Sequence, residues 1–238
     1  MNLLLLNPED CPEPGLARLS GRRLQHVQEV HRAAVGESLR VGLLGGGMGS
    51  GLITTLNPDL LELQFTLTEA PPAKLPLTLV LALPRPKMLK RILQTVAAMG
   101  VARLVLLHSY RVEKSFWSTP WLEPAALHEQ LLLGLEQARD TVLPEVLIER
   151  RFKPFVEDRL PGLSAGSLRL LAHPVAASAC PVALQEPATL VIGPEGGFIP
   201  YEVELLAAQG FAAVHLGPRI LRVENAVPAL LARLYPPG

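Results

Sequence analysis

From residue 77 onward the chain alternates continuous apolar runs with amphipathic stretches, and this alternation restricts the fold more than any other feature. Leu77–Leu83 is apolar throughout, as a strand buried on both faces of a sheet must be. Residues 88–96 then place an apolar side chain at every third or fourth position, and Gly100 closes this helix. Strands that alternate with helices form a mainly parallel sheet, so we predict an α/β fold.

The rest of this region follows the same alternation. Further strands are predicted at Arg103–Leu107, Leu168–Ala172, Thr189–Ile192 and Ala212–Leu216. Further helices are predicted at Leu122–Arg139, Tyr201–Gln209 and Asn225–Leu234, the last with Asn225 as its N-cap. Ligands of open parallel sheets bind beyond the carboxyl ends of the strands, which directs attention to His173, Gly193 and Gly217.

Residues 1–70 show a different pattern, in which Pro, Gly and Asn-Pro separate short β segments. The predicted strands are Leu3–Leu6, Ser38–Leu44, Gly51–Leu56 and Leu60–Leu67, with a hairpin turn in the glycine run Gly45–Gly51. One basic helical stretch, Ser20–Ala34, interrupts them. Ala70–Ala73 contains two prolines and continues neither a strand nor a helix easily. We therefore expect two domains, residues 1–70 and 74–238.

Composition excludes several classes of protein. Hydrophobic residues make up 49% of the chain and charged residues 18%, which is the balance of a globular protein rather than a disordered one. The two cysteines, Cys11 and Cys180, lack metal-ligand spacing, so no metal and a cytoplasmic location are expected. No apolar run is long enough to span a membrane. A membrane is therefore not expected as a partner.

The charges cancel, with 22 basic and 22 acidic residues, which runs against the basic excess usual in nucleic-acid binders. A net charge of zero can still conceal a local basic patch. The candidate is the Ser20–Ala34 stretch, where Arg22, Arg23 and Arg32 would face RNA phosphates. The alternative is an ordinary solvated helix face.

The segment Val191–Phe198, VIGPEGGF, is a strand that runs into a glycine-rich loop. Glycines there permit positive φ angles and let a ligand approach the backbone closely. A tight turn without a ligand is the competing interpretation. The loop matches neither the Gly-Lys-Ser/Thr phosphate-binding pattern nor Gly-x-Gly-x-x-Gly.

A second strand also ends in Gly-Pro, in the segment His215–Ala226, HLGPRILRVENA. Arg219 and Arg222 flank two apolar residues, so one side chain could face a ligand and the other a partner. Two solvated arginines before a helix are the alternative. Because both Gly-Pro loops follow strands of one parallel sheet, we expect them at the same edge.

These two loops carry a resemblance to a known family. VIGPEGGF, then E-x-x-x-L-x-x-x-G-F and LGPRILRVENA, resemble the C-terminal signature of the bacterial 16S rRNA uridine-N3 methyltransferases, within the SPOUT (trefoil-knot) superfamily. The stretch LSGRRLQHVQEVHRAAVGESLRVGLLGGGMGSG resembles the PUA-like domain of that family, and LALPRPKMLKRILQTVAAMGV resembles the start of its catalytic domain. Nearly the whole chain is covered.

The resemblance implies a PUA-like RNA-binding β-barrel in residues 1–70 and a SPOUT methyltransferase domain in residues 74–238. It further implies S-adenosylmethionine as methyl donor, the rRNA of the small ribosomal subunit as substrate, and a homodimer. Arg222, Glu195 and Glu224 become the polar candidates beside the methyl group. The donor contacts implied by the motifs are Leu171, His173, Ile192, Gly193, Pro194, Gly196, Gly197, Leu216, Gly217, Ile220 and Leu221.

These residue types suit the chemistry. Uridine N3 is a weak nucleophile until its proton leaves, so the site needs a base or a cation that stabilises the resulting anion. Arg222 can hold the developing charge but cannot accept a proton at neutral pH. Glu195, Glu224 or water would be the acceptor. Because N3 lies on the Watson–Crick edge, the target base must be unpaired or extruded.

The chain departs from the family pattern outside the glycine loops. Val223–Ala226 replaces the usual Thr-Glu-Thr-Ala, and Thr95 and Ala98 stand where the family has Lys and Glu. Three alternatives follow: an RNA-binding relative without turnover, a methyltransferase for a different nucleotide, and an unrelated nucleotide-binding α/β enzyme. Binding of S-adenosylmethionine would distinguish the last of these from the others.

Overall fold

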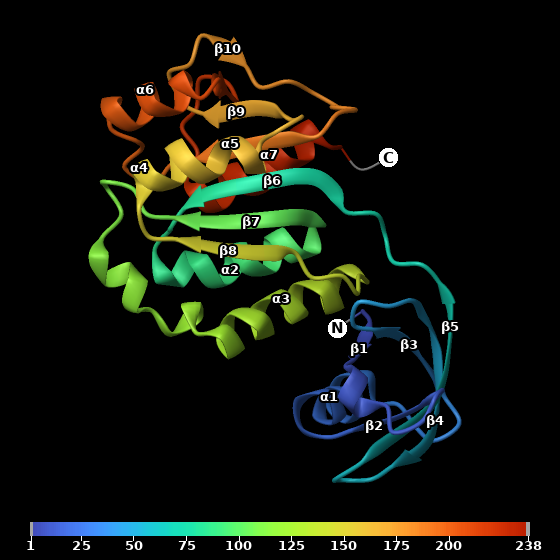
Figure 1. Cartoon of the computed structure of the whole chain (residues 1–238). Coiled ribbons are helices and arrows are strands. Elements are labelled where there is room, and N and C mark those ends of the chain that lie inside the picture. The colour runs from blue at the N-terminus through green and yellow to red at the C-terminus, as the bar shows by residue number, and fades with distance from the viewer. Residues whose placement is uncertain (1, 237–238) are drawn as a thin grey trace. The chain divides into compact units, whose positions relative to one another are not determined.

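The computed structural model describes residues 2–236, and the chain divides into two compact units (Figure 1). The first unit contains Met1–Ala73 together with Leu131–Leu143. The second contains Lys74–Gln130 together with Pro144–Gly238. The chain therefore leaves the second unit after Gln130 and re-enters it at Pro144.

A five-stranded mixed sheet forms the first unit, in the order β1-β3-β4-β5-β2. β1 runs parallel to β3, and every other neighbouring pair is antiparallel. The four strands predicted in this region are present, and the glycine run contains the turn that joins β3 to β4. The strands are β1 (Leu4–Leu6), β2 (Leu16–Leu19), β3 (Ser38–Leu43), β4 (Met48–Leu56) and β5 (Leu61–Glu69).

One face of this sheet supplies the core of the first unit. Alternate residues of a strand point to the same face, so Leu4 and Leu6 of β1 and Leu61 and Leu63 of β5 are all buried. Leu24 completes the same cluster from the helix. The helix predicted over Ser20–Ala34 is present as α1 (Gly21–His26) and the π-helix η2 (Val27–His31), after the short 3-10 helix η1 (Pro8–Asp10).

Seven parallel strands form the sheet of the second unit, in the order β10-β12-β9-β11-β6-β7-β8. The predicted α/β fold with a parallel sheet is confirmed. Two strands, β8 and β10, were not predicted. The strands are β6 (Leu75–Ala82), β7 (Val101–Leu107), β8 (Glu145–Glu149), β9 (Leu168–Ala172), β10 (Ser178–Ala179), β11 (Ala188–Ile192) and β12 (Ala212–His215).

Helices connect these strands. The longer helices are α2 (Pro86–Ala98), α3 (Pro124–Ala138), α6 (Pro200–Ala208) and α7 (Val223–Leu234). The shorter ones are η3 (Lys114–Ser118), η4 (Pro120–Leu122), α4 (Phe152–Pro154), the π-helix η5 (Phe155–Arg159) and α5 (Leu160–Leu163). The prediction of Asn225 as N-cap is wrong. α7 begins at Val223 with Arg222 as its N-cap, which puts Asn225 in the first turn.

The centre of the parallel sheet is buried, as its apolar sequence requires. All five residues of β11 are buried, and Leu77–Ala82 of β6 is buried as well. The predicted apolar stripe of α2 is confirmed, because Leu89, Ile92 and Leu93 are among its buried residues, and α2 packs against α7. Across residues 2–236, no helix combines the length and apolar character needed to cross a membrane.

Candidate functional site

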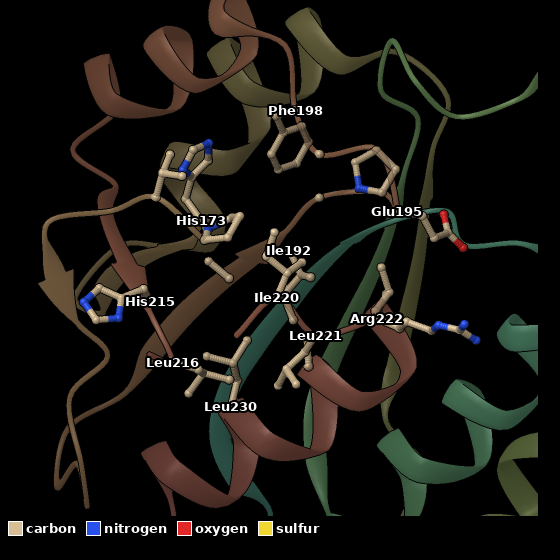
Figure 2. A pocket seen from close by; sticks show the side chains of 18 of the residues that line it. His173, Ile192, Glu195, Phe198, His215, Leu216, Ile220, Leu221, Arg222 and Leu230 are labelled. Carbon is tan, nitrogen blue, oxygen red and sulfur yellow. The ribbon is translucent and has the colours of Figure 1, made fainter. Parts of the chain in front are cut away.

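A cavity of about 450 Å³ opens at the carboxyl ends of β9, β11 and β12, the strands to which the sequence directs attention. These strands are consecutive in the sheet, so their following loops meet at one edge. Figure 2 shows the side chains of 18 of the residues that line the cavity. The lining is formed by Arg111, Ala172, His173, Pro174, Val175, Ile192, Gly193, Pro194, Glu195, Gly196, Gly197, Phe198, Val214, His215, Leu216, Gly217, Arg219, Ile220, Leu221, Arg222, Val223, Ala226 and Leu230.

The first wall of the cavity is the loop Gly193–Phe198, which we call the β11 loop. The N–H of Gly197 donates to the carbonyl of Pro194 at 2.7 Å, and Gly197 has φ +72°, so the chain reverses in a tight turn. A Cβ atom at Gly193 would lie 3.1 Å from the ring of Phe198. Glycine at these two positions is therefore required by the turn itself and by the packing of Phe198.

Two side chains outside the β11 loop hold it. The buried carboxylate of Glu202 accepts the N–H of Ile199 at 3.1 Å and the N–H of Tyr110 at 2.7 Å. It thus ties the start of α6 to the loop that follows β7. The guanidinium of Arg111 donates to the carbonyl of Gly196, and Arg111 also lines the cavity.

Sequence reasoning missed both of these residues. Arg111 follows β7 by four positions, so the rule that loops at carboxyl strand ends bind ligands also applies to it. Glu202 had no such signal. An isolated glutamate in a helix is usually solvated, and its partners lie three and 92 positions away in the chain.

The second wall is the loop Leu216–Leu221, which we call the β12 loop. Gly217 has φ +117°, and its N–H donates to Nδ1 of His215 at 2.9 Å. A Cβ atom at Gly217 would meet no protein atom within 4 Å, so this position faces open space. Within residues 2–236, residues 218–221 form no hydrogen bond, and Ile220 is 81% exposed.

The structure brings together nearly all of the predicted donor contacts. Leu171 is the exception: it is buried within β9 and does not line the cavity, whereas the next residue, Ala172, does. The residues at the cavity are His173, Ile192, Gly193, Pro194, Gly196, Gly197, Leu216, Gly217, Ile220 and Leu221.

The three polar candidates are placed differently. Arg222 and Glu195 line the cavity, and Figure 2 shows both side chains extending toward the same side of it. One carboxylate oxygen of Glu195 accepts the N–H of Arg85 at 3.2 Å, which orients this side chain. Glu224, in the first turn of α7, is not among the lining residues.

The three arginines of the first unit have separate roles in the structure. Arg22 forms two hydrogen bonds of 2.9 Å with the buried carboxylate of Glu136. Arg23 pairs with Asp10 at 2.5 and 2.7 Å. Two of the three charges are thus matched by carboxylates of the same unit. Arg32 is exposed and ends η2 with a φ of 52°.

Comparisons with known proteins agree with this geometry. Residues 71–235 match the model of the RNA methyltransferase domain family. The chain is 30% identical to a ribosomal RNA small subunit methyltransferase E from Treponema pallidum, over 98% of this chain and 90% of that one. It is 28% identical to a protein of the same name from Synechocystis, over 97% of this chain and 76% of that one.

Solved structures share the fold. A ribosomal RNA small subunit methyltransferase E from Neisseria gonorrhoeae, bound to S-adenosylmethionine, superposes with a TM-score of 0.75 at 22% identity, over 96% of this chain and 94% of that one. A methyltransferase from Legionella pneumophila in complex with the same cofactor gives a TM-score of 0.71 at 25% identity, over 98% and 96% of the two chains.

Proposed function

Because this chain belongs to the family of ribosomal RNA small subunit methyltransferase E, we propose that it transfers a methyl group from S-adenosylmethionine to 16S rRNA. The observation that carries the proposal is the cavity between the β11 and β12 loops. It lies at the carboxyl edge of a parallel sheet and gathers the predicted donor contacts. Two of the relatives with this fold are described with S-adenosylmethionine bound.

The residues present fit this cofactor. A cavity of about 450 Å³ is within the size range of sites for small organic ligands. Ile192, Leu216 and Leu221 offer apolar surface for a flat base, and Gly217 leaves its backbone open to a ligand. S-adenosylmethionine would supply an electrophilic methyl group on a sulfonium cation. The glycines and apolar residues would bind and orient it without introducing a competing nucleophile.

We assign the stabilisation of charge and the removal of the proton to Arg222 and Glu195. The target is proposed to be uridine N3, whose proton must leave before the nitrogen can attack a methyl group. Arg222 would stabilise the negative charge that develops on the base, because its guanidinium stays protonated. Glu195, at the same side of the cavity, would accept the proton or position a water that does so. Glu224 remains a weaker candidate, because it does not line the cavity.

The finer features of the fold are part of the proposal. For the second unit we propose a trefoil knot, supported by the way the chain end returns to an earlier segment. The N–H groups of Ala183 and Leu184 donate to the carbonyls of Arg233 and Leu234 at the end of α7, at 3.0 and 2.7 Å. For the first unit we propose a PUA-like RNA-binding barrel, supported by its mixed five-stranded sheet.

A homodimer and a cytoplasmic location complete the proposal. The dimer is supported by the apolar side chains of Ile220 and Leu221, which are 81% and 40% exposed beside the cavity and would be covered by a second copy. Arg32 is the proposed RNA contact of the first unit. Arg22 and Arg23 are also proposed as RNA contacts, each while it remains paired with its carboxylate, Glu136 or Asp10.

Mass spectrometry of 16S rRNA nucleosides from cells with and without the gene tests the function. We expect one methylated uridine to disappear in the deletion strain and to return with the gene. Loss of a different methylated nucleoside would show that the protein is a methyltransferase with another target nucleotide. Unchanged nucleosides, with tight binding of S-adenosylmethionine by the purified protein, would favour an RNA-binding relative without turnover.

A further inference from the structure

Three neighbouring strands of the second unit end at the same level. β6, β7 and β8 are parallel, with Ala82 paired to Leu107 and Leu107 paired to Glu149 at their last residues. Adjacent strands of a sheet lie about 4.8 Å apart, so the loops that follow them start within about 10 Å of one another. Figure 1 shows the three arrowheads at one edge of the sheet.

These loops carry an excess of positive charge in a chain whose total charge is zero. Arg85 and Lys87 follow β6, Arg111 follows β7, and Arg150 and Arg151 follow β8, and all five side chains are exposed. Residues 84–91 and 150–153 contain no acidic residue. We call these five residues the basic edge.

Among the described residues, no carboxylate forms an ion pair with four of the five cations of the basic edge. In the described part of the chain, Arg85, Lys87, Arg150 and Arg151 form no ion pair. The acid at the end of β8, Glu149, is already engaged by Arg159.

An aromatic ring orients one of these cations instead. The guanidinium of Arg150 lies 5.1 Å from the ring centre of Trp117. Nε1 of Trp117 in turn donates to Nδ1 of His108 at 2.9 Å. Stacking on an aromatic face leaves the N–H edge of a guanidinium available, and that edge matches a phosphate in geometry and charge.

The basic edge adjoins the cavity. The backbone N–H of Arg85 donates to Glu195, and Arg111 both lines the cavity and donates to the carbonyl of Gly196. A target base that meets the methyl group beside Glu195 and Arg222 would leave its neighbouring phosphates at this edge. A row of cations across three strand ends suits the evenly repeated charges of a nucleic-acid backbone.

We infer that the basic edge is a docking surface for the RNA backbone that flanks the target nucleotide. The inference rests on the proposed methyl transfer to rRNA and adds a second RNA contact region, on the catalytic unit itself. It assigns to Arg150 and Trp117 a role in RNA binding that the motifs do not indicate.

The test compares two full-length triple variants with equal loss of charge. The first is Arg85→Gln, Arg150→Gln, Arg151→Gln. The control is Arg103→Gln, Arg169→Gln, Arg233→Gln, three arginines of the second unit whose guanidinium groups already donate to Glu145 and to the carbonyls of Gln209 and Cys180. The probes are a protein-free 16S rRNA transcript and intact small ribosomal subunits, and affinity is measured at several salt concentrations without S-adenosylmethionine.

We expect the first variant to bind the transcript about tenfold more weakly, with a salt slope smaller by roughly two to three, since each lost phosphate contact removes about one. The control should stay within about twofold of the unmodified protein. Affinity for S-adenosylmethionine should be equal in all three proteins.

Equal transcript affinity and slope in the two variants would overturn the inference. A loss confined to intact subunits would also overturn it, because the partner would then be a ribosomal protein. Methyl transfer by the unmodified protein is measured separately, so failure of the proposed function is distinguishable from failure of this inference.

Discussion

The two loops that wall the cavity differ in how the rest of the protein holds them. The β11 loop is fastened by Arg111 at the carbonyl of Gly196, and its exit into α6 is fastened by the buried carboxylate of Glu202. In the described part of the chain, the β12 loop is held by the hydrogen bond from the N–H of Gly217 to Nδ1 of His215, and it exposes 81% of Ile220.

We infer that the β11 loop is ordered before a ligand binds, whereas the β12 loop becomes ordered on binding. Ordering a loop on binding costs conformational entropy, which lowers affinity, whereas a fastened loop contributes its contacts without that cost. We therefore expect S-adenosylmethionine binding to protect the backbone of residues 217–221 from hydrogen exchange far more than that of residues 194–198.

The largest effect is expected from Gly217→Val in the β12 loop. A β-branched residue at φ +117° is strained by roughly 1–3 kcal/mol. It would also add a side chain at a residue that lines the cavity and has no protein atom within 4 Å of the Cβ position, where we expect it to obstruct a ligand. We predict that calorimetry detects no binding of S-adenosylmethionine by a protein that remains folded.

Gly36→Val is the matched control for this variant. Gly36 has φ +91° in a turn of the first unit, and a Cβ atom there would likewise meet no neighbour within 4 Å. The substitution should cost stability but preserve binding of S-adenosylmethionine. Unchanged affinity in Gly217→Val would show that the cavity is not the donor site.

A smaller effect, on turnover alone, is expected from Arg222→Ala, at the N-cap of α7 directly after the β12 loop. Removing one preorganised donor to a charge that develops in the transition state typically lowers the rate by about 10²–10³. Single-turnover methyl transfer to small ribosomal subunits should show this loss while the affinity for S-adenosylmethionine changes little. Arg219→Ala is the comparison, because Arg219 also lines the cavity. If Arg219→Ala lost turnover and Arg222→Ala did not, the stabilisation of the developing charge would belong to Arg219 instead of Arg222.

The smallest effect is expected from Glu202→Gln, which loosens the fastened wall. The glutamine would turn one of its two acceptor oxygens into an N–H donor that faces a backbone N–H, leaving a buried group unsatisfied at a cost of about 1–3 kcal/mol. Urea unfolding should show this loss, and affinity for S-adenosylmethionine should fall several-fold. Glu204→Gln, at an exposed position of the same helix, should change neither. A Glu202→Gln loss as large as that of Gly217→Val would remove the distinction between the two loops.

The sequence predicts best those strands that consist of a run of consecutive, mostly apolar residues. Leu168–Ala172 was predicted with the bounds of β9, and Thr189–Ile192 falls one residue short of β11. Both lie in the middle of the parallel sheet and are mostly apolar, although β9 also contains Arg169. The glycine loops that follow could be located for the same reason.

The missed elements depend on partners far along the chain. β8 lies at the edge of the sheet, begins and ends with glutamate, and forms because it pairs with β7. β2 has four residues and, among the described strands, pairs with β5 at the end of the sheet. Glu202 could not be singled out either, since its role depends on Tyr110, and no local pattern reports a contact across 92 positions.

The return of residues 131–143 to the first unit has a consequence for how this protein can be divided and recombined. The carbonyl of Glu136 accepts the N–H groups of Asn2 and Leu3, and its carboxylate binds Arg22. A gene fragment that stops at Ala70–Ala73 would therefore encode a first unit that lacks residues 131–143, the segment that binds Asn2 and Leu3. An exchange of that unit between relatives would therefore have to carry two separate stretches of coding sequence, residues 1–73 and 131–143.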